Sequence, residues 1–389
     1  MKESLRQAAG SLLVVGLGGE ELTALERAWL KLIRPAGIIL FKRNIADAAQ
    51  TRALLAEATG FCTPHFGAFV DVEGGTVDRL RDVLAPIPSV QAVAQAMSLR
   101  PGEDLHNPTL GAKTKPRQGW GTRRSFAREH GELVARAAKA FGFNSSLAPV
   151  LDLALPESRQ VMETRCAAAT GAGVVAYARE FFLGLASQGV VGCGKHFPGL
   201  GGGTLDSHLE TPEIRRTWPQ LWQEDLEPYR ALRDQMPMVM VNHAAYPLTA
   251  DANRPATVSK FWMQTVLRKR LGYRGMVVSD DLEMGGVTKF MPIGEAAIAT
   301  VRMGAELALI CHHPEPILEV YEALIREGER SAAFHKILIE RARESARKRT
   351  KIFPARMPTA LTVKQFEALR SRILRFGEMV AQTAAQGIR

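Results

Sequence analysis

The 389-residue sequence predicts an α/β protein with a (β/α)8 barrel of the TIM type. Three observations favour this fold: short apolar, β-branched runs recur, stretches of helix length separate them, and polar residues follow nearly every run. The predicted strands are residues 12–17, 37–41, 68–71, 146–151, 190–195, 238–241, 275–279 and 307–311. Strands and helices that alternate in this way are typical of a parallel barrel.

The residues that end these runs predict where the functional site lies. In chain order they are Lys42, Arg43 and Asn44, then Asp71 and Glu73, Asp152, Lys195 and His196, Asn242 and His243, Asp280 and Asp281, and finally His312 and His313. In a barrel the carboxyl ends of the strands converge on one face, which carries the active site. A doubly wound open sheet is the alternative, but Gly16, Gly18 and Gly19 do not form its dinucleotide fingerprint.

Three regions depart from a plain barrel, which we place at residues 1–352 as one catalytic domain. Residues at about 99–125 contain proline, glycine and basic residues without periodicity, and they predict an inserted surface loop. Residues 154–169 follow the fourth strand and contain Arg165, a candidate clamp for an anion or a hydroxyl. Residues 353–389 predict a C-terminal helical extension packed on the barrel, with a helix at about 362–385.

The composition limits the class of protein. A hydrophobic content of 46% with 23% charged residues is typical of globular chains rather than disordered ones. Four cysteines without a Cys-x-x-Cys pair favour neither a zinc ribbon nor a disulfide framework, so we expect reduced thiols in a cytoplasmic protein. No run approaches the roughly 18 apolar residues of a membrane span. The net charge of +10 would suit an anionic substrate weakly, and we expect no nucleic-acid partner because much of the excess lies in solvated stretches such as 341–351.

The segment 194–208 is rich in glycine and contains a lysine, two histidines and an aspartate. Stability of the fold does not require this combination, so it indicates a functional role. Lys195 and His196 stand where the fifth strand is predicted to end, a glycine-rich stretch at 199–203 follows, and Asp206 and His208 come next. If the chain is extended there, Asp206 could hold one ring nitrogen of His208 and leave the other for proton transfer. The segment therefore predicts a mobile acid/base. The alternative is an ordinary strand end with loop polar residues.

The seventh predicted strand ends in two adjacent carboxylates, Asp280 and Asp281. Because consecutive strand residues point to opposite faces, we expect only one of them, Asp280, to aim into the barrel axis. Retaining glycoside hydrolysis needs a carboxylate nucleophile opposite a proton donor. Histidine is an unusual donor, but its unperturbed pKa of about 6.5 suits a group that gives and then takes a proton near neutrality.

The string Lys-His-Phe-Pro-Gly-x-Gly-x-x-x-x-Asp-Ser-His at 195–208 resembles the family 3 glycoside hydrolases, specifically the single-domain β-N-acetylhexosaminidases that trim cell-wall muropeptides. The stretches 40–44, 71–79, 148–152 and 279–284 agree with that family in the same order, and the resemblance covers roughly residues 10–350. Leu200, Val72 and Cys166 depart from it, since the family usually has His, Gln and Ser there.

The resemblance implies that Asp280 is the nucleophile, His208 the acid/base and Asp206 its partner. The residues that it implies hold the sugar in the −1 subsite are Asp71, Arg79, Arg165, Lys195 and His196. It further implies a cytoplasmic, retaining exo-β-N-acetylglucosaminidase acting on GlcNAc-MurNAc or GlcNAc-anhydroMurNAc fragments from peptidoglycan recycling. We expect a monomer without cofactor, metal or membrane association.

Other functions remain open at this level. A phosphorylase is the closest rival, because a histidine acid/base does not repel phosphate as a carboxylate would, and a β-glucosidase of the same family is another. A metal-dependent barrel hydrolase could use His196, His208, His243, His312 and Asp280 as ligands. Against it, Lys195 beside His196 would repel a cation. A non-catalytic sugar-binding protein is the last alternative.

Overall fold

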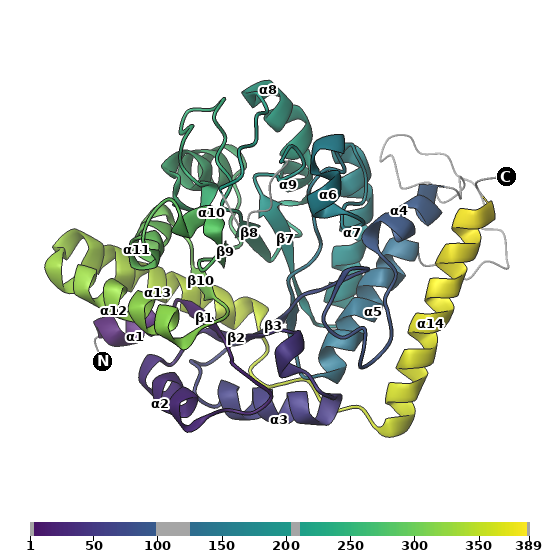
Figure 1. Ribbon diagram of the computed structural model, residues 1–389, viewed down its shortest axis with the longest axis horizontal. Coiled ribbons are helices and arrows are strands. Elements are labelled where there is room, and N and C mark those ends of the chain that lie inside the picture. The colour runs from purple at the N-terminus through teal and green to yellow at the C-terminus, as the bar shows by residue number, and fades with distance from the viewer. Residues whose placement is uncertain (1–3, 99–124, 204–210, 387–389) are drawn as a thin grey trace, which may run out of the picture.

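The computed structural model describes residues 4–98, 125–203 and 211–386. Within these residues, eight parallel strands close into a barrel in the order β1-β10-β9-β8-β7-β6-β3-β2 (Figure 1). The strands are β1 (Leu13–Gly16), β2 (Gly37–Leu40), β3 (Gly67–Val70), β6 (Ser145–Ser146), β7 (Val191–Phe197), β8 (Met238–Val241), β9 (Met276–Asp281) and β10 (Leu307–Ile310). Each predicted run overlaps one of them, so the predicted barrel is confirmed and the open sheet is excluded.

Helices cover the outside of the barrel. Those between or after strands are α2 (Ala24–Ile33), α3 (Ala48–Thr59), α4 (Val90–Ser98), α5 (Phe126–Ala140), α6 (Arg159–Met162), α7 (Gly171–Ser187), α8 (Trp218–Gln220), α9 (Glu227–Leu232), the π-helix η5 (Phe261–Arg270), α10 (Gly285–Thr288), α11 (Ile293–Met303) and α12 (Pro314–Arg330). Capping determines where α2 begins: Thr23 Oγ1 accepts the N–H of Glu26, and the Glu26 carboxylate accepts the N–H of Thr23.

The strands bury both of their faces, in two separate hydrophobic clusters. Val14 of β1 and Ile39 of β2 belong to the inner cluster, whereas their neighbours Val15 and Ile38 pack in the outer cluster against the helices. This alternation explains why the strands read as continuous apolar runs, as in other parallel sheets with covered faces. Phe353 packs edge-on against Phe69 with ring centroids 5.7 Å apart and belongs to the inner cluster.

Two strands differ in length from the prediction. The fourth predicted run forms a strand only at Ser145–Ser146, since Pro149 has no N–H to give to a ladder, and pairing resumes as an isolated bridge between Val150 and Lys195. In contrast, β7 continues to Phe197. Lys195 and His196 therefore lie within the strand. Backbone hydrogen bonds with Pro149 and Leu151 hold Lys195, whereas the side chains of Asp152 and Asn242 hold the backbone of His196.

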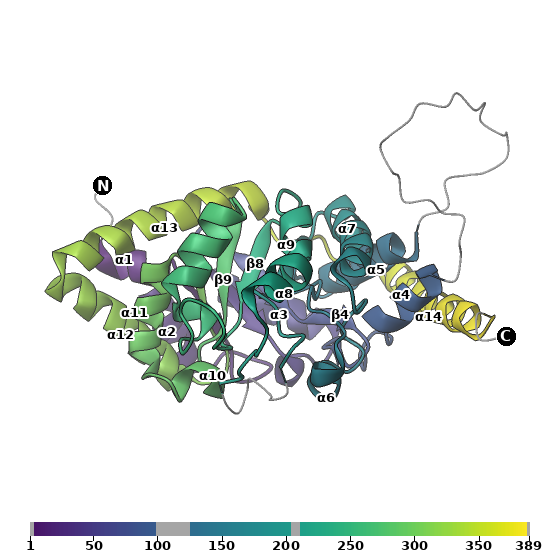
Figure 2. The same ribbon diagram turned by 90° about the horizontal axis from the view of Figure 1, so that it is seen from above.

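Three further α-helices are α1 (Leu5–Gly10), α13 (Ala332–Ile352) and α14 (Val363–Gln386). α14 lies alongside α4 and α5 in both views (Figures 1 and 2), where Phe376 packs on Phe126 and Arg372 pairs with Glu129 at 2.8 Å. The predicted insertion lies outside the described residues except for Ser125, the N-cap of α5. Among the helices that the structure describes, none is both long and apolar enough to cross a bilayer.

Candidate active site

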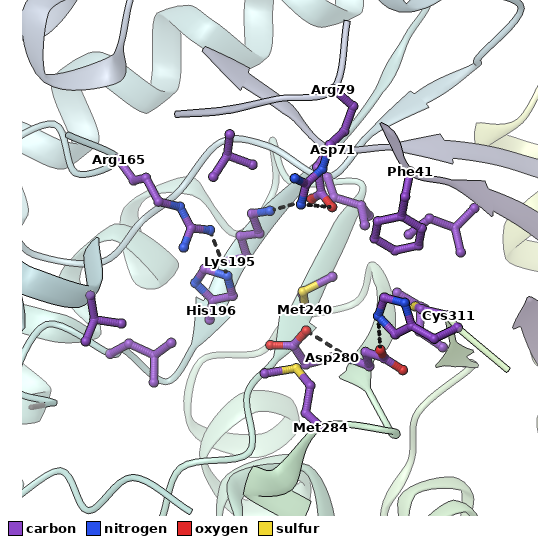
Figure 3. Close-up of a pocket in the computed structure, with 18 of the residues that line it drawn as sticks. Phe41, Asp71, Arg79, Arg165, Lys195, His196, Met240, Asp280, Met284 and Cys311 are labelled. Atoms are coloured by element: carbon purple, nitrogen blue, oxygen red, sulfur yellow. Dashed lines mark hydrogen bonds and ion pairs between the residues drawn. The ribbon is translucent and has the colours of Figure 1, made fainter. Parts of the chain in front are cut away.

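A pocket opens at the carboxyl ends of the barrel strands. Six of the residues singled out in the sequence line it together: Asp71, Arg79, Arg165, Lys195, His196 and Asp280. Figure 3 shows Lys195, His196 and Arg165 reaching the space from one side and Asp280 with Met284 from another. Strand ends that are far apart in the sequence thus bring these groups to one place, as the barrel topology requires.

Buried ion pairs hold two cations, Lys195 and Arg165, on one side of the pocket. Lys195 Nζ lies 2.9 Å from Asp71 Oδ1 and 2.6 Å from Glu73 Oε1. Arg165 donates to both oxygens of Glu73 at 2.8 Å, through Nε and Nη2. Arg79 is a looser partner, with Nη2 3.8 Å from Asp71 Oδ2. This bidentate and shared pairing fixes the position of both cations before any ligand arrives.

The same contacts set the charge states of these groups. Burial alone would raise the pKa of the Asp71 carboxyl, but the charges of Lys195 and Arg79 outweigh burial and hold that pKa below its usual value. Burial likewise opposes the ionised form of Glu73, yet the charges of Arg165 and Lys195 outweigh burial and hold the pKa of Glu73 well below its usual value. For Lys195, burial is outweighed by Asp71 and Glu73, which raise its pKa. The cluster therefore stays fully ionised near neutral pH.

His196 is oriented by Asp152, a residue that the sequence analysis placed at the end of the fourth strand without assigning it to the site. Asp152 Oδ2 accepts a hydrogen bond from His196 Nδ1 at 2.7 Å and another from the His196 backbone N–H at 3.2 Å. Its other oxygen accepts the N–H of Leu200 at 2.7 Å. With Nδ1–H donating to Asp152, the second ring nitrogen, Nε2, faces the pocket as an acceptor and lies at a long hydrogen-bond distance of 3.5 Å from Arg165 Nη2.

Asp280 and Asp281 both line the pocket, so the expectation that only one could reach it is wrong. The cause is a bulge in β9: Leu307 of β10 pairs with Val278 and Leu309 pairs with Asp281, which leaves one extra residue in β9. A bulge breaks the alternation of strand faces and redirects side chains. Asp280 Oδ1 accepts the N–H of Asp281 at 2.9 Å, and Asp281 Oδ2 pairs with His312 Nε2 at 3.2 Å.

The wall beside Asp281 contains further residues that were not assigned to the site from the sequence. Arg43 donates to the carbonyls of Leu17 and Cys311 and contacts His312 Nδ1 at 3.1 Å. The ring of His312 lies 5.1 Å from that of Phe41. Glu283 accepts the backbone N–H groups that follow β10, at Cys311, His312 and His313. All of them stand just after strand ends. The sequence analysis used that signal for Arg43 and His312 without giving them a role toward the sugar, and the same signal could have found Phe41 and Glu283.

Asp206 and His208 lie outside the described residues. Leu200, which precedes this segment, lines the pocket. After it, Thr211 Oγ1 donates to the carbonyl of Gly286 at 2.7 Å. The described chain on either side of the segment is therefore attached close to the pocket, because Gly286 follows the lining residue Met284 in sequence.

The sequence profile of the glycosyl hydrolase family 3 N-terminal domain matches residues 4–343. The chain belongs to this family. A family 3 membership makes the protein a glycoside hydrolase and confirms the resemblance drawn from the motifs. Glycoside hydrolase activity also agrees with the pocket, where the Asp280 carboxylate faces polar groups such as Lys195 and His196 across the mouth of the barrel.

Related family 3 proteins resemble the chain over most of its length. A β-hexosaminidase of Methylococcus capsulatus is 36% identical over 79% of this chain and 85% of its own. A family 3 β-N-acetylglucosaminidase from Paenibacillus sp. FPU-7 superposes with a TM-score of 0.80 at 27% identity, covering 96% of this chain and 69% of that one. Native NagZ from Neisseria gonorrhoeae gives a TM-score of 0.72 at 27% identity, covering 96% and 98%. The Neisseria protein is also known in complex with N-trifluoroacetyl-D-glucosamine.

The His, Cys, Asp and Glu side chains in the described part of the chain do not cluster as metal ligands would. Within residues 4–98, 125–203 and 211–386, no three His, Cys, Asp or Glu side chains are grouped closely enough to hold a metal ion. Of the ligands considered for a metal-dependent hydrolase, His196 is bound to Asp152 and His243 to the carbonyl of Asp281 and to Thr257. Of the other candidates, His312 pairs with Asp281, Asp280 accepts the N–H of Asp281, and His208 lies outside the described residues.

Proposed function

We propose that the protein is a retaining exo-β-N-acetylglucosaminidase that removes terminal β-GlcNAc from peptidoglycan-derived muropeptides. The observation that carries the proposal is the Asp280 carboxylate, which lines the pocket and, among the described residues, pairs with no cation. Lys195, by contrast, is already neutralised by Asp71 and Glu73. A carboxylate without a counterion, set opposite fixed sugar-binding groups, is suited to attack an anomeric carbon.

In the proposed first step, Asp280 attacks C1 of the sugar and displaces the aglycone to form a glycosyl-enzyme. His208, positioned by Asp206, gives its proton to the leaving oxygen. In the second step His208 takes a proton from water, and the hydroxide equivalent attacks C1 and releases Asp280. The two displacements retain the configuration at C1; the proton that His208 gave leaves on the aglycone, and the proton taken from water restores His208 to its starting form. The roles of His208 and Asp206 rest on the family motif.

The proposed −1 subsite consists of the remaining predicted residues. Lys195 and Arg165 present donors held by buried carboxylates, and Asp71 presents a carboxylate oxygen as an acceptor for sugar hydroxyls. His196, held by Asp152, offers Nε2 to the same space. Groups that are fixed in advance lose little entropy on binding and hold the ring in position for attack.

The names of the related proteins support an N-acetylhexosamine as the sugar that is released. We propose GlcNAc-MurNAc or GlcNAc-anhydroMurNAc fragments as substrates, because the carboxylates of such fragments are compatible with the net charge of +10. We place the activity in a monomer in the cytoplasm. The four cysteines are free thiols, as expected of a protein in a reducing compartment.

The test compares initial rates on an aryl β-N-acetylglucosaminide and an aryl β-glucoside near neutral pH, with a chelator present. A strong preference for the N-acetyl substrate is expected. A preference for the glucoside would contradict the proposed specificity, and loss of activity with chelator would favour a metal-dependent hydrolase. Added phosphate identifies the acceptor: a sugar 1-phosphate product would make the protein a phosphorylase instead.

A further inference from the structure

A second cavity lies at the opposite end of the barrel from the candidate active site. We call it the basal cavity, and the residues that line it are Pro237, Arg268, Tyr273, Arg274, Gly275, Met276, Glu344, Arg347, Lys348, Lys351 and Ile352. Its volume of about 430 Å³ is within the range of small-molecule pockets. In Figure 2 α13 runs along the upper side of the barrel, whereas α6 and α10, which flank the candidate active site, lie at the lower side.

Two of the cations that line the basal cavity are bound by the fold. The carboxylate of Glu306 is fully buried and accepts Arg268 Nη2 at 2.8 and 2.9 Å and Lys348 Nζ at 2.7 Å. Arg268 also donates to the carbonyls of Tyr273 and Gly275, and Lys348 to that of Gly275. Arg268 and Lys348 therefore have structural partners within the protein, and no bound ligand is needed to account for their charges.

Three other cations of the basal cavity have no such explanation. Arg274, Arg347 and Lys351 are exposed, and within the described part of the chain no carboxylate pairs with any of them. Arg347 and Lys351 lie near the C-terminal end of α13, where positive charge is favoured by the helix dipole. That effect does not apply to Arg274, which stands in the loop before β9 and converges on the same cavity.

The charges around the basal cavity leave a strong positive excess. Arg268, Arg274, Arg341, Arg347, Lys348 and Lys351 are six cations, and Glu306 and Glu344 are the two carboxylates among them, which gives a local net charge of +4. Like charges brought together raise the energy of the folded protein unless an anion binds between them.

The walls of the basal cavity indicate the form of that anion. Arg274 and Arg347 come from different elements and can each present two N–H donors to a tetrahedral oxyanion, the geometry that favours phosphate. Pro237, Met276 and Ile352 add an apolar wall. We propose that the basal cavity binds a small phosphorylated molecule with an apolar or planar part. This inference does not rest on the proposed glycosidase function.

The test measures binding of phenyl phosphate and of inorganic phosphate to the full chain by titration calorimetry at constant ionic strength. We expect one saturable site for phenyl phosphate, with weaker binding of inorganic phosphate. Because charge-assisted hydrogen bonds are lost, the double variant Arg274→Gln/Arg347→Gln should weaken phenyl phosphate binding at least about tenfold. Lys351→Gln should weaken it by a smaller factor.

The matched control is Arg326→Gln/Arg370→Gln, which removes the same charge from two exposed arginines outside the basal cavity. This control should bind phenyl phosphate as tightly as wild type, and no variant should have a lower unfolding midpoint or a lower hydrolase rate than wild type. The proposal is overturned if wild type shows no saturable binding at millimolar concentration. Equal binding by wild type and the basal double variant, or equal weakening in the control, would overturn it as well.

Discussion

Glu73 Oε1 lies 2.6 Å from the ammonium nitrogen of Lys195, and both side chains are buried. The same carboxylate binds Arg165 through two hydrogen bonds. Glu73 is not among the residues that line the pocket, yet it holds two cations that are. The geometry of the proposed sugar site therefore depends on the Glu73 carboxylate, which is buried beneath the residues that line the pocket.

The change Glu73→Gln should destabilise the protein strongly. It removes one partner of a buried charge network and leaves Lys195 and Arg165 with less compensation, which typically costs about 3–5 kcal/mol of unfolding free energy. Denaturant unfolding measures this cost. Glu57→Gln is the control, because its pair with Arg27 is half exposed and should contribute little. Equal effects of the two changes would contradict the structural role of Glu73.

Asp280→Asn should abolish nearly all turnover while the fold is kept. An amide cannot form the glycosyl-enzyme, and loss of a covalent nucleophile typically costs at least about 10³-fold in kcat. The rates are measured on the aryl β-N-acetylglucosaminide, with thermal unfolding as the check on folding. Asp234→Asn, at an exposed aspartate, is the control. If Asp280→Asn kept activity within about tenfold of wild type, the nucleophile would have to be another residue.

His208→Ala should lower turnover in a way that depends on the leaving group. Loss of a general acid typically costs about 10²–10⁴-fold on substrates with poor leaving groups. Activated aryl glycosides need less protonation, so their rate should fall less. The measurement is kcat on a disaccharide substrate and on a nitrophenyl glycoside. Equal losses on both substrates would argue against a proton-donor role, and no loss on either would exclude it.

The pair of His312 and Asp281 should make stability depend on pH. The hydrogen bond to Asp281 raises the pKa of His312 above its usual value despite partial burial, with Glu283 adding to the rise and Arg43 opposing it. Because the folded-state pKa is raised, the stabilisation is fully present below the unfolded pKa of about 6.5 and is lost as pH rises through the folded value.

The variant His312→Gln tests this dependence, since glutamine stays neutral throughout. The stability of wild type relative to the variant should be greater at about pH 6 than at about pH 8.5, by at most about 1 kcal/mol because the pair is partly exposed. Urea unfolding at both pH values gives the difference. His335→Gln, at an exposed histidine of α13, should show no such trend. A reversed trend would contradict the assigned pairing.

Much of the fold could be predicted because its signals are local. Most barrel strands consist of or begin with an apolar run such as Gly37–Leu40 or Met238–Val241, and burial on both faces makes the run continuous. The bulge in β9 could not be predicted in this way. It depends on the register between β9 and β10, and therefore on hydrogen bonds to another strand. The alternation argument for Asp280 and Asp281 failed at that point.

The sequence alone decides the fold class, the end of the barrel that carries the site, and which polar residues stand there, because strand periodicity and position along a strand are local properties. The tertiary structure decides which of those residues bind one another. Lys195 and Asp71 are 124 positions apart, and His196 and Asp152 are 44 apart. A buried charge is stabilised only by a partner within about 3 Å, and only the closed barrel brings such residues to that distance.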